Sequence, residues 1–419
     1  MNTVMDDNKV LTLVSNERVP LSDGMRMLFE IDSLANATPA TVSRAGILYL
    51  NESDVGWRPM VDSWVQKRER EVERAHLPGM FDKYIERVAE EVRRRYKTIT
   101  PVVMISGVTS VTRYMDSFLE DWAPETEPTP EDIEHCFVLS MAWAFGGALT
   151  VDRTKGVAGD YRRAFHDLLC EMAAPNVKFP KEYEGVEDAL CFDFYYNREH
   201  KEYRPWSERV EKYVHVPIGT SADERPFDRI TVQTVDSIRV STLMDRVVKQ
   251  GHSVMLVGTA GTGKSTLVKN YLNTGVPANF DTKVINANYF MDSKALQSQL
   301  DSSIDKRSGR VFGPPTGRKM VIFVDDLNLP YIETYGTQNS LSLLRQAIDH
   351  GSFFDRDDLG LKKELADVQF ISAMNPTAGS FKIAMRLQRQ FTLFATLMPS
   401  DGDLQTIYQS IMDGHFRVN

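Results

Sequence analysis

The residues best suited to chemistry form the run Gly258-Thr259-Ala260-Gly261-Thr262-Gly263-Lys264-Ser265, which matches the phosphate-binding loop pattern of Gly, four residues, Gly, Lys and Ser. The apolar run Ser253–Val257 predicts a buried strand before it, and Thr266–Tyr271 begins a helix after it. Glycines let backbone N–H groups turn inward around phosphate oxygens. Lys264 would reach the terminal phosphates and Ser265 would offer a hydroxyl to Mg²⁺. The alternative is a glycine-rich turn with a surface lysine. Thr266 and Val235 complete the predicted nucleotide-binding residues.

A pair of carboxylates follows a second strand pattern, Met320–Val324. In a P-loop fold the carboxylate that organises Mg²⁺ lies at the carboxyl end of such a strand. We assign this role to Asp325. Asp326 stands where hydrolytic relatives usually carry Glu as the base that polarises water. Asp is one methylene shorter and reaches the water less well. The pair therefore supports nucleotide binding and does not support rapid hydrolysis.

A third strand pattern, Val368–Met374, ends at Asn375-Pro376. The Asn375 amide at the tip of a neighbouring strand could orient an attacking water. An Asn-Pro pair also opens turns, and taken alone this interpretation is the stronger one.

The elements needed to position these residues alternate along the second half of the chain, which predicts an α/β domain from about residue 230 with a parallel sheet covered by helices on both faces. The strand patterns are Lys283–Ala287, Met320–Val324, Val368–Met374 and Phe391–Leu397, and the helical patterns are Ser293–Asp305, Gln338–His350 and Asp401–Ile411.

Upstream, residues 57–180 carry mainly helical patterns. The run Lys67–Arg74 mixes both signs, which favours a solvated helix face over a binding patch. Asp121–Asp132 has the composition of a loop, Phe192–Val216 that of strands over a core, and Pro217–Pro226 that of a connector. Cys136–Val151 is shorter than the roughly 20 residues of a membrane span, so we interpret it as a buried helix.

Composition excludes several classes of protein. The 419 residues carry 49 Lys plus Arg against 58 Asp plus Glu, a net charge of −9, which disfavours a dedicated nucleic-acid binder. The 21 Phe, 15 Tyr and 5 Trp argue against disorder. Three cysteines, Cys136, Cys170 and Cys191, share no metal-ligand spacing and are expected to be reduced thiols. The first residues lack the apolar core of a secretory signal.

The first fifty residues repeat the order of elements near the end of the chain. The strand patterns Met25–Ile31 and Ile47–Leu50 enclose Asn36, Pro39 and Arg44. Near the other end, Val368–Met374 and Phe391–Leu397 enclose Asn375, Pro376, Arg386 and Arg389 in the same order. The repeat predicts the second half of one α/β module at the start and a nearly complete second module at the end.

These residues resemble the dynein heavy chain family. Gly258–Ser265, Asp325–Pro330, Tyr335–Gln338, Met374–Phe381 and Arg386–Phe391 look like the third AAA+ module of the dynein ring. Asn2–Lys9 and Pro39–Arg44 look like the latter part of the second module. The resemblance covers nearly the whole chain and is most similar to axonemal outer-arm forms.

The resemblance implies roles for several residues. Asn375 would be the sensor of the third site. Arg44 would be the arginine finger directed at the first module's nucleotide, and Arg389, with Arg386 close by, the finger for the second. The alternative for both arginines is a surface salt bridge. A neighbour's guanidinium would stabilise charge on a transferring phosphoryl group. Asp326 suits a site that binds nucleotide and regulates the ring.

We therefore expect a fragment with four parts: residues 1–56 from the second module's α/β domain, 57–190 its helical lid, 191–229 a connector and 230–419 the third α/β domain. The resemblance implies an ATPase motor segment of the ciliary or flagellar axoneme that binds ATP or ADP with Mg²⁺. Its partners would be other AAA+ modules of the same chain and, through other regions, dynein intermediate and light chains and microtubules, with no nucleic acid or membrane. The alternative is a regulatory nucleotide site without turnover. A GTPase is not supported, because the sequence contains no Asn-Lys-x-Asp string of the kind that reads guanine.

Overall fold

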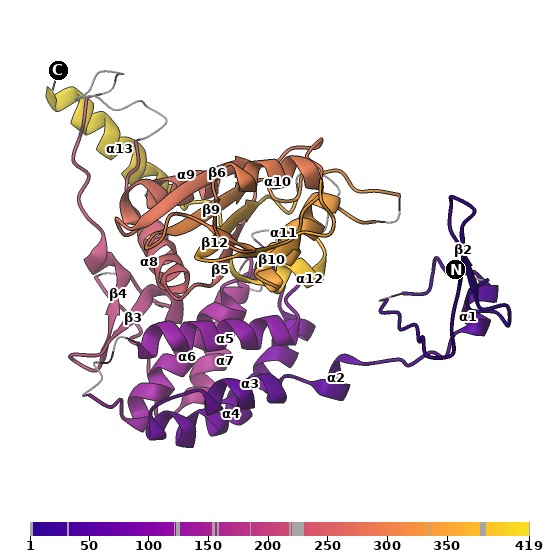
Figure 1. The fold of residues 1–419 in the computed structure, drawn as a ribbon. Coiled ribbons are helices and arrows are strands. Elements are labelled where there is room, and N and C mark those ends of the chain that lie inside the picture. Colours follow the sequence, from indigo (N-terminus) through magenta and orange to yellow (C-terminus); the bar gives the residue numbers. More distant parts are fainter. Residues whose placement is uncertain are drawn as a thin grey trace. The chain divides into compact units, whose positions relative to one another are not determined.

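The structure is a computed structural model that describes residues 3–31, 33–120, 122, 126–152, 156, 159–184, 186–217, 219, 230–334, 336–377 and 383–418. The chain divides into two compact units, Met1–Gly56 and Trp57–Asn419. The larger unit contains a helical domain, defined as residues 57–209, and a P-loop domain, defined as residues 230–418 (Figure 1). Most of the predicted connector, at residues 218 and 220–226, lies outside the described residues.

A five-stranded parallel sheet forms the centre of the P-loop domain, in the order β13-β5-β12-β9-β6. The sequence patterns predict these strands closely, although β6 begins earlier and β13 ends earlier than expected. The strands are β5 (Ser253–Val257), β6 (Phe280–Asn286), β9 (Lys319–Asp325), β12 (Val368–Met374) and β13 (Phe391–Ala395).

Helices cover both faces of this sheet because its strands are apolar on both sides. In β5, Val254 and Leu256 join one core with helices α8 (Val235–Lys249) and α9 (Lys264–Asn270). The alternate residues, Met255 and Val257, join a second core on the other face. Its helices are α10 (Ser293–Asp301), α11 (Asn339–Asp349) and α12 (Met385–Gln388). A short π-helix, Tyr271–Gly275, follows α9, and α13 spans Asp401–Val418.

A second, smaller sheet was not predicted. It has the order β10-β11-β8-β7, and β7 starts at Asp305, so the predicted helix Ser293–Asp305 is wrong in its last turn. Its strands have three or four residues each and are too short to give a clear alternating pattern. They are β7 (Asp305–Ser308), β8 (Val311–Gly313), β10 (Ser352–Phe354) and β11 (Lys362–Leu365).

The helical domain agrees with the helical patterns upstream. Its helices are α3 (Arg58–Gln66), α4 (Glu71–Arg95), α5 (Met104–Leu119), α6 (Pro130–Gly146) and α7 (Tyr161–Ala173). The aromatic segment forms the hairpin of β3 (Phe194–Asn197) and β4 (Glu202–Pro205), flanked by 3₁₀ turns at Cys191–Asp193 and Trp206–Arg209. Helix α6 is almost wholly buried. Among the described residues, no helix is both long and apolar enough to cross a bilayer.

The predicted loop Asp121–Asp132 is wrong at its end, because α6 already begins at Pro130. Thr129 caps the helix by accepting from the Asp132 N–H, and Asp132 reciprocates by accepting from the Thr129 N–H. Residues 121 and 123–125 lie outside the described residues. Cys136, Cys170 and Cys191 are free, in agreement with the expected thiols.

The helical domain packs directly on the edge strand β13 of the large sheet. Gly147 O accepts from the Ala395 N–H at 2.7 Å, and Arg113 Nη1 donates to Thr392 Oγ1 at 3.3 Å. Phe394 contacts Trp143 and Tyr114 with ring centroids 6.2 Å apart in each case. The two domains therefore share one apolar core. The helical domain also supplies a hydrogen-bond partner to the backbone of β13 at Ala395, on the edge where no further strand of the described residues pairs.

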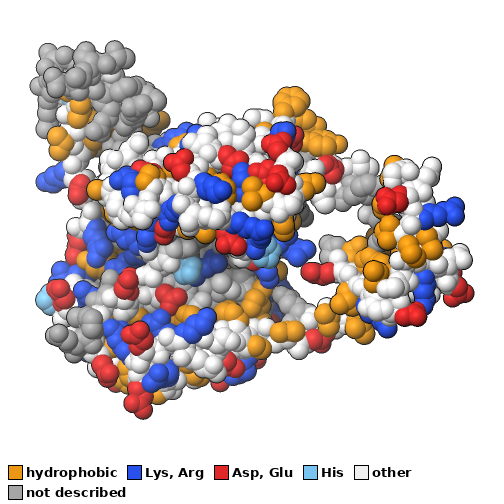
Figure 2. Space-filling model, in the orientation of Figure 1, with side chains coloured by type: hydrophobic (Ala, Val, Ile, Leu, Met, Phe, Trp, Pro, Cys, Tyr) orange, Lys and Arg blue, Asp and Glu red, His pale blue; other side chains and the backbone are white. Residues whose placement is uncertain are grey.

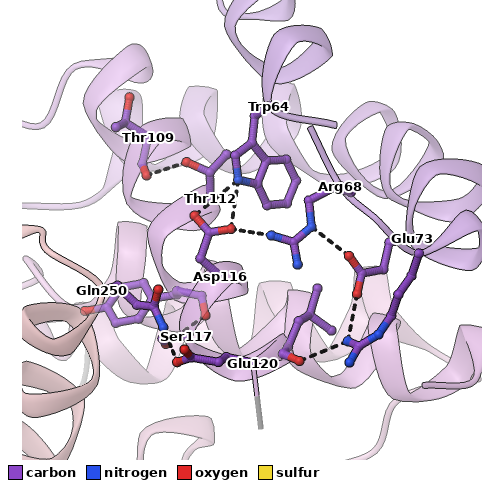
Figure 3. Close-up of polar contacts among 12 residues, drawn as sticks. Trp64, Arg68, Glu73, Thr109, Thr112, Asp116, Ser117, Glu120 and Gln250 are labelled. Atoms are coloured by element: carbon purple, nitrogen blue, oxygen red, sulfur yellow. Dashed lines mark hydrogen bonds and ion pairs between the residues drawn. The ribbon is translucent and has the colours of Figure 1, made fainter. Parts of the chain in front are cut away.

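The charged run Lys67–Arg74 is not a solvated helix face throughout, which corrects the sequence interpretation. Glu73 is only 1% exposed and accepts from Arg68 Nε at 2.6 Å and from Arg70 Nη1 at 3.1 Å. Figure 3 shows Arg68 continuing to Asp116, which also accepts from Trp64 Nε1. The Glu73 carboxylate can be buried because two guanidinium groups of opposite charge, those of Arg68 and Arg70, contact it.

The unit Met1–Gly56 contains strands β1 (Val10–Thr12) and β2 (Arg18–Pro20) and helices α1 (Pro39–Arg44) and α2 (Glu52–Val55). The predicted strands Met25–Ile31 and Ile47–Leu50 are wrong, because in the described residues both segments lack a paired neighbour. Their apolar side chains stay exposed, as at Leu28 and Leu48. Figure 2 shows hydrophobic side chains, in orange, on the surface of this unit. An apolar pattern forms a strand only when a neighbouring strand accepts its backbone hydrogen bonds.

Removing the buried carboxylate of the Arg68–Glu73 pair should destabilise the helical domain. Glu73→Gln removes the buried anion that Arg68 and Arg70 share and leaves Arg68 with Asp116 as its remaining carboxylate partner. We expect the free energy of unfolding in urea to fall by about 3 kcal/mol. Glu69→Gln, at an exposed position four residues earlier, is the matched control. Equal midpoints for the two variants would contradict the role of this network.

A histidine beside the domain contact should make stability depend on acid. Burial, with the nearby Arg113 guanidinium, lowers the pKa of His252 to about 4. The unfolded chain therefore binds a proton near pH 6.5 that the folded chain resists, so His252 removes stability as the pH falls from about 6.5 to about 4. The free energy of unfolding, measured in urea titrations, should therefore fall less in His252→Gln than in the wild type as the pH is lowered through this range. The difference should reach about 2 to 3 kcal/mol at the acid end. His200→Gln, at an exposed position, is the control, and an equal gain there would refute the assignment.

Candidate functional site

The phosphate-binding loop links the carboxyl end of β5 to α9, as predicted. Gly261 and Gly263 have φ values of 82° and 80°, a region that glycine enters without strain. At Gly258 a Cβ atom would lie 2.3 Å from Thr396 Oγ1, so only glycine fits against this neighbour. The three glycines thus fix a loop whose backbone can turn inward.

Lys264 begins helix α9 and its side chain folds over the loop. Nζ donates to Thr259 O at 2.8 Å and lies 3.4 Å from Thr262 Oγ1. The residue is 9% exposed, and burial lowers the pKa of the ammonium group, opposed by the nearby carboxylates of Asp326 and Asp325. The ammonium group is therefore held at the loop, where an anionic oxygen would meet it.

Ser265 and Asp325 lie together although sixty residues separate them. Ser265 Oγ donates to Asp325 Oδ1 at 2.9 Å, and Lys269 Nζ lies 3.8 Å from Asp325 Oδ2. Asp325 is the last residue of β9, and β12 lies between β9 and β5 in the parallel sheet. A hydroxyl and a carboxylate are hard oxygen ligands of the kind that Mg²⁺ prefers, so the residues fit the predicted ion.

Asp326 differs from its neighbour in exposure and backbone. Its φ is 55°, in the left-handed region, and its side chain is exposed. Burial of part of the carboxyl and the adjacent Asp325 raise the pKa of Asp326, while Lys264 and Lys269 oppose the rise. Asp tolerates this backbone better than longer residues do. The conformation therefore gives a physical reason for Asp at a position that Glu would fill at greater cost.

Asn375 follows β12 and opens a turn. Its Oδ1 accepts from the Thr377 N–H at 3.1 Å and from Thr377 Oγ1 at 2.8 Å. Asn328, which is 1% exposed, donates through Nδ2 to Asn375 O at 2.9 Å and so ties the segment after β9 to this turn. The structure agrees with the turn interpretation, and the water-orienting role stays a prediction.

A cavity of about 980 Å³ borders the loop, a size within the range of small-molecule sites. Its walls include Gly261–Gly263 of the loop, Ile230–Thr234 before α8, and Ala395–Leu397 after β13. The helical domain contributes Trp143 and Arg162, and α13 contributes Leu404 and Ile407. Lys264, Ser265 and Asp325 are not in this lining. The predicted Val235 is not in it either, because its side chain packs on the core while its neighbours line the cavity.

The two predicted arginine fingers lie in salt bridges. Arg44, at the end of α1, places Nη2 3.0 Å from Asp6 Oδ2. Arg389 lies after α12, with Nη2 3.9 Å from Asp349 Oδ2. Because Phe391 pairs with Ser253 at the start of β5, Arg389 is at the amino edge of the sheet, opposite the loop. Arg389 therefore does not serve the loop of its own domain.

Thr396 is a site residue that the sequence reasoning missed. Its Oγ1 lies 3.3 Å from Thr262 Oγ1, and its N–H donates to Val257 O at 2.8 Å. Its closeness to Gly258 explains why that glycine has no room for a side chain. The sequence analysis placed Thr396 inside the predicted strand Phe391–Leu397, whereas the structure ends this strand at Ala395. Only its place near the carboxyl end of that predicted strand could have indicated it.

The parallel sheet, the glycine loop and the Ser265–Asp325 pair together define a P-loop nucleotide-binding protein with an attached helical domain. The described residues contain no group of three metal-ligating side chains of His, Cys, Asp or Glu.

Comparisons with known proteins identify the family. Residues 220–399 match the P-loop containing dynein motor region, and residues 77–208 match the dynein heavy chain AAA lid domain. The chain is 42% identical over its full length to dynein axonemal heavy chain 9 of Homo sapiens. Over 99% of its length it is 43% identical to a ciliary dynein beta chain of Tripneustes gratilla and 38% identical to the flagellar outer arm beta chain of Chlamydomonas reinhardtii.

The chain belongs to the dynein heavy chain family. It spans 9% of the length of these relatives. The resemblance stated from the sequence is thereby confirmed, although Tyr335 and residues 378–381 of its motif strings, like Asn2, lie outside the described residues.

Proposed function

We propose that the P-loop domain binds ATP and ADP with Mg²⁺ as one nucleotide site of an axonemal dynein ring. The observation that carries this proposal is the contact of Ser265 Oγ with Asp325 Oδ1 at 2.9 Å beside a glycine loop of the right length. Backbone N–H groups of Gly261–Ser265 bind the phosphates, and Lys264 adds a positive charge to them. Ser265 and Asp325 hold Mg²⁺, which neutralises charge on the phosphate oxygens when bound.

The base and ribose of the nucleotide occupy the cavity between the loop and the segment Ile230–Thr234. This wall combines apolar side chains with the hydroxyls of Thr231 and Thr234. Adenine sites are of this kind, mostly apolar with a few polar groups that fix orientation.

Two candidate activities remain for the site, and Asp326 separates them. In the first, Asp326 acts as the base that polarises water and Asn375 helps to orient that water. In the second, the site binds nucleotide without turnover and regulates the ring. The second candidate is favoured by the short side chain, which reaches an attacking water less well than Glu would.

The wider role follows from the relatives, which are named axonemal, ciliary and flagellar dyneins. We place this chain in the motor ring of an axonemal dynein, a microtubule ATPase of cilia or flagella. Residues 1–56 and 57–190 would belong to the second module, 191–229 to a connector and 230–419 to the third. The partners are the other AAA+ modules, with intermediate and light chains and microtubules reached through other regions.

Arg44 and Arg389 are proposed to act on the sites of neighbouring modules. Each lies at the end of a short helix, and an ion pair holds each one at the surface. The position of Arg389 opposite its own loop supports action on another module. Exposed ion pairs of this type are weak, so a phosphate can displace the carboxylate.

Binding at the loop is tested by titrating the purified chain with a fluorescent ADP analogue. Lys264→Ala should weaken binding about 10- to 100-fold, because a buried charge-assisted contact is lost. Ser265→Ala should remove the tightening of binding that Mg²⁺ causes. Lys294→Ala, at an exposed lysine of α10, is the matched control. Unchanged affinity in Lys264→Ala would place the nucleotide elsewhere.

The two candidate activities are separated by single-turnover hydrolysis of bound ATP. The regulatory candidate predicts that ATP stays intact on the wild type and that Asp326→Glu turns it over at least about tenfold faster, one decade being 1.4 kcal/mol of barrier. Because Glu adds strain of about 1 kcal/mol in the left-handed region, the unfolding of each variant is measured in parallel. Asp326→Asn keeps the backbone preference and is the inactive control. Rapid turnover by the wild type would reject the regulatory candidate.

A further inference from the structure

A short path of contacts joins helix α7 of the helical domain to the phosphate loop. Arg162 Nη2 donates to Ala395 O at 3.2 Å, and the Ala395 N–H donates to Gly147 O at 2.7 Å. The backbone N–H and the carbonyl of Ala395, the last residue of β13, are thus both hydrogen-bonded to the helical domain. This position, at the carboxyl end of the edge strand, is directly beside the loop.

The next residue, Thr396, carries the path into the loop. Its N–H donates to Val257 O at 2.8 Å, and its Oγ1 lies 3.3 Å from Thr262 Oγ1. There is no spare room at this point, since a Cβ on Gly258 would lie 2.3 Å from Thr396 Oγ1 and 2.4 Å from its carbonyl oxygen. A displacement of Ala395 therefore moves Thr396 against the loop.

Arg162 is an unusual residue to place at such a contact. It is 8% exposed, its Nε has no hydrogen-bond partner among the described residues, and its guanidinium lies 5.4 Å from the Phe192 ring centroid. Burial lowers its pKa to about 10, and the adjacent Arg239 adds to the effect. Arg239 has Asp193 and Asp236 as ion-pair partners. A buried cation with incomplete partners is costly, so packing alone gives no reason for it.

The location of Arg162 supplies a reason, because it lines the cavity that borders Gly261–Gly263. Its side chain comes from α7, more than 200 residues before β13 in the sequence. It is therefore the point at which the helical domain reaches both the nucleotide cavity and the peptide that abuts the loop.

We propose that Arg162 is a positioning residue for the phosphate loop: it fixes the Ala395 carbonyl, keeps Thr396 against Gly258 and Thr262, and so couples nucleotide binding to the packing of α7. The inference rests on the proposed nucleotide site and adds to it a residue from the helical domain. Coupling is reciprocal, so bound nucleotide also stabilises the contact of α7 with β13.

The test uses a double-mutant cycle on the full 419-residue chain, with a fluorescent ADP analogue as the probe. Arg162→Gln removes the guanidinium group whose Nη2 donates to the Ala395 carbonyl, and Thr396→Val removes the hydroxyl while keeping the shape of the side chain. Each single change should weaken ADP binding about 5- to 20-fold. The double variant should bind ADP as tightly as the single variant that has the lower affinity. Arg163→Gln, on the same helix with its contact at Asp188, is the matched control and should bind like the wild type.

A role in general stability alone would give a different result. If the two effects multiply, or if Arg162→Gln binds within twofold of the wild type, the inference is overturned. If the wild type itself does not bind the probe, the proposed nucleotide site fails instead.

A second measurement needs no variant and covers the case in which Arg162→Gln does not fold. Hydrogen exchange of the wild-type chain is compared with and without ADP and Mg²⁺. We expect added nucleotide to slow exchange at least threefold in α7 and at residues 395–397, together with the loop. Protection confined to the loop would contradict the coupling.

Discussion

The parallel pairing of β5, β12 and β9 is the constraint on which the rest of the site depends. Because these strands run in one direction and in register, their carboxyl ends meet at the same edge of the sheet. This brings the loop after β5, Asn375 after β12 and Asp325 at the end of β9 into one region, with Ser265 Oγ 2.9 Å from Asp325 Oδ1. No local feature of the chain could join residues so distant in sequence.

The edge of this sheet is also where the two domains meet. An unpaired edge strand exposes backbone polar groups, and the helical domain covers β13 through Gly147, Arg113 and Arg162. Two of these residues, Gly147 and Arg162, hydrogen-bond to Ala395, which is followed by Thr396 beside the phosphate loop. Stability of the domain contact and order in the nucleotide site are thus linked through a few residues.

Much of the fold could be predicted because its signals are local. β5 and β12 match their apolar runs at both ends, and the spacing of Gly258, Gly263, Lys264 and Ser265 located the loop. Met25–Ile31 shows the limit, since an equally apolar pattern stays unpaired in the described residues. The charge of Glu73 predicted exposure, yet two arginines make its burial stable. The roles of Thr396 and Arg162 could not be predicted, because they arise only from tertiary contacts between distant segments.

The account is tested most directly by an experimental structure of the chain with Mg²⁺ and a non-hydrolysable ATP analogue. It predicts phosphate oxygens within hydrogen-bond distance of the N–H groups of Gly261–Ser265. It also predicts Mg²⁺ bound by Ser265 Oγ, with Asp325 as a direct or water-mediated partner. Nucleotide bound away from the loop, or a magnesium ion held by Asp326 without Ser265, would contradict it.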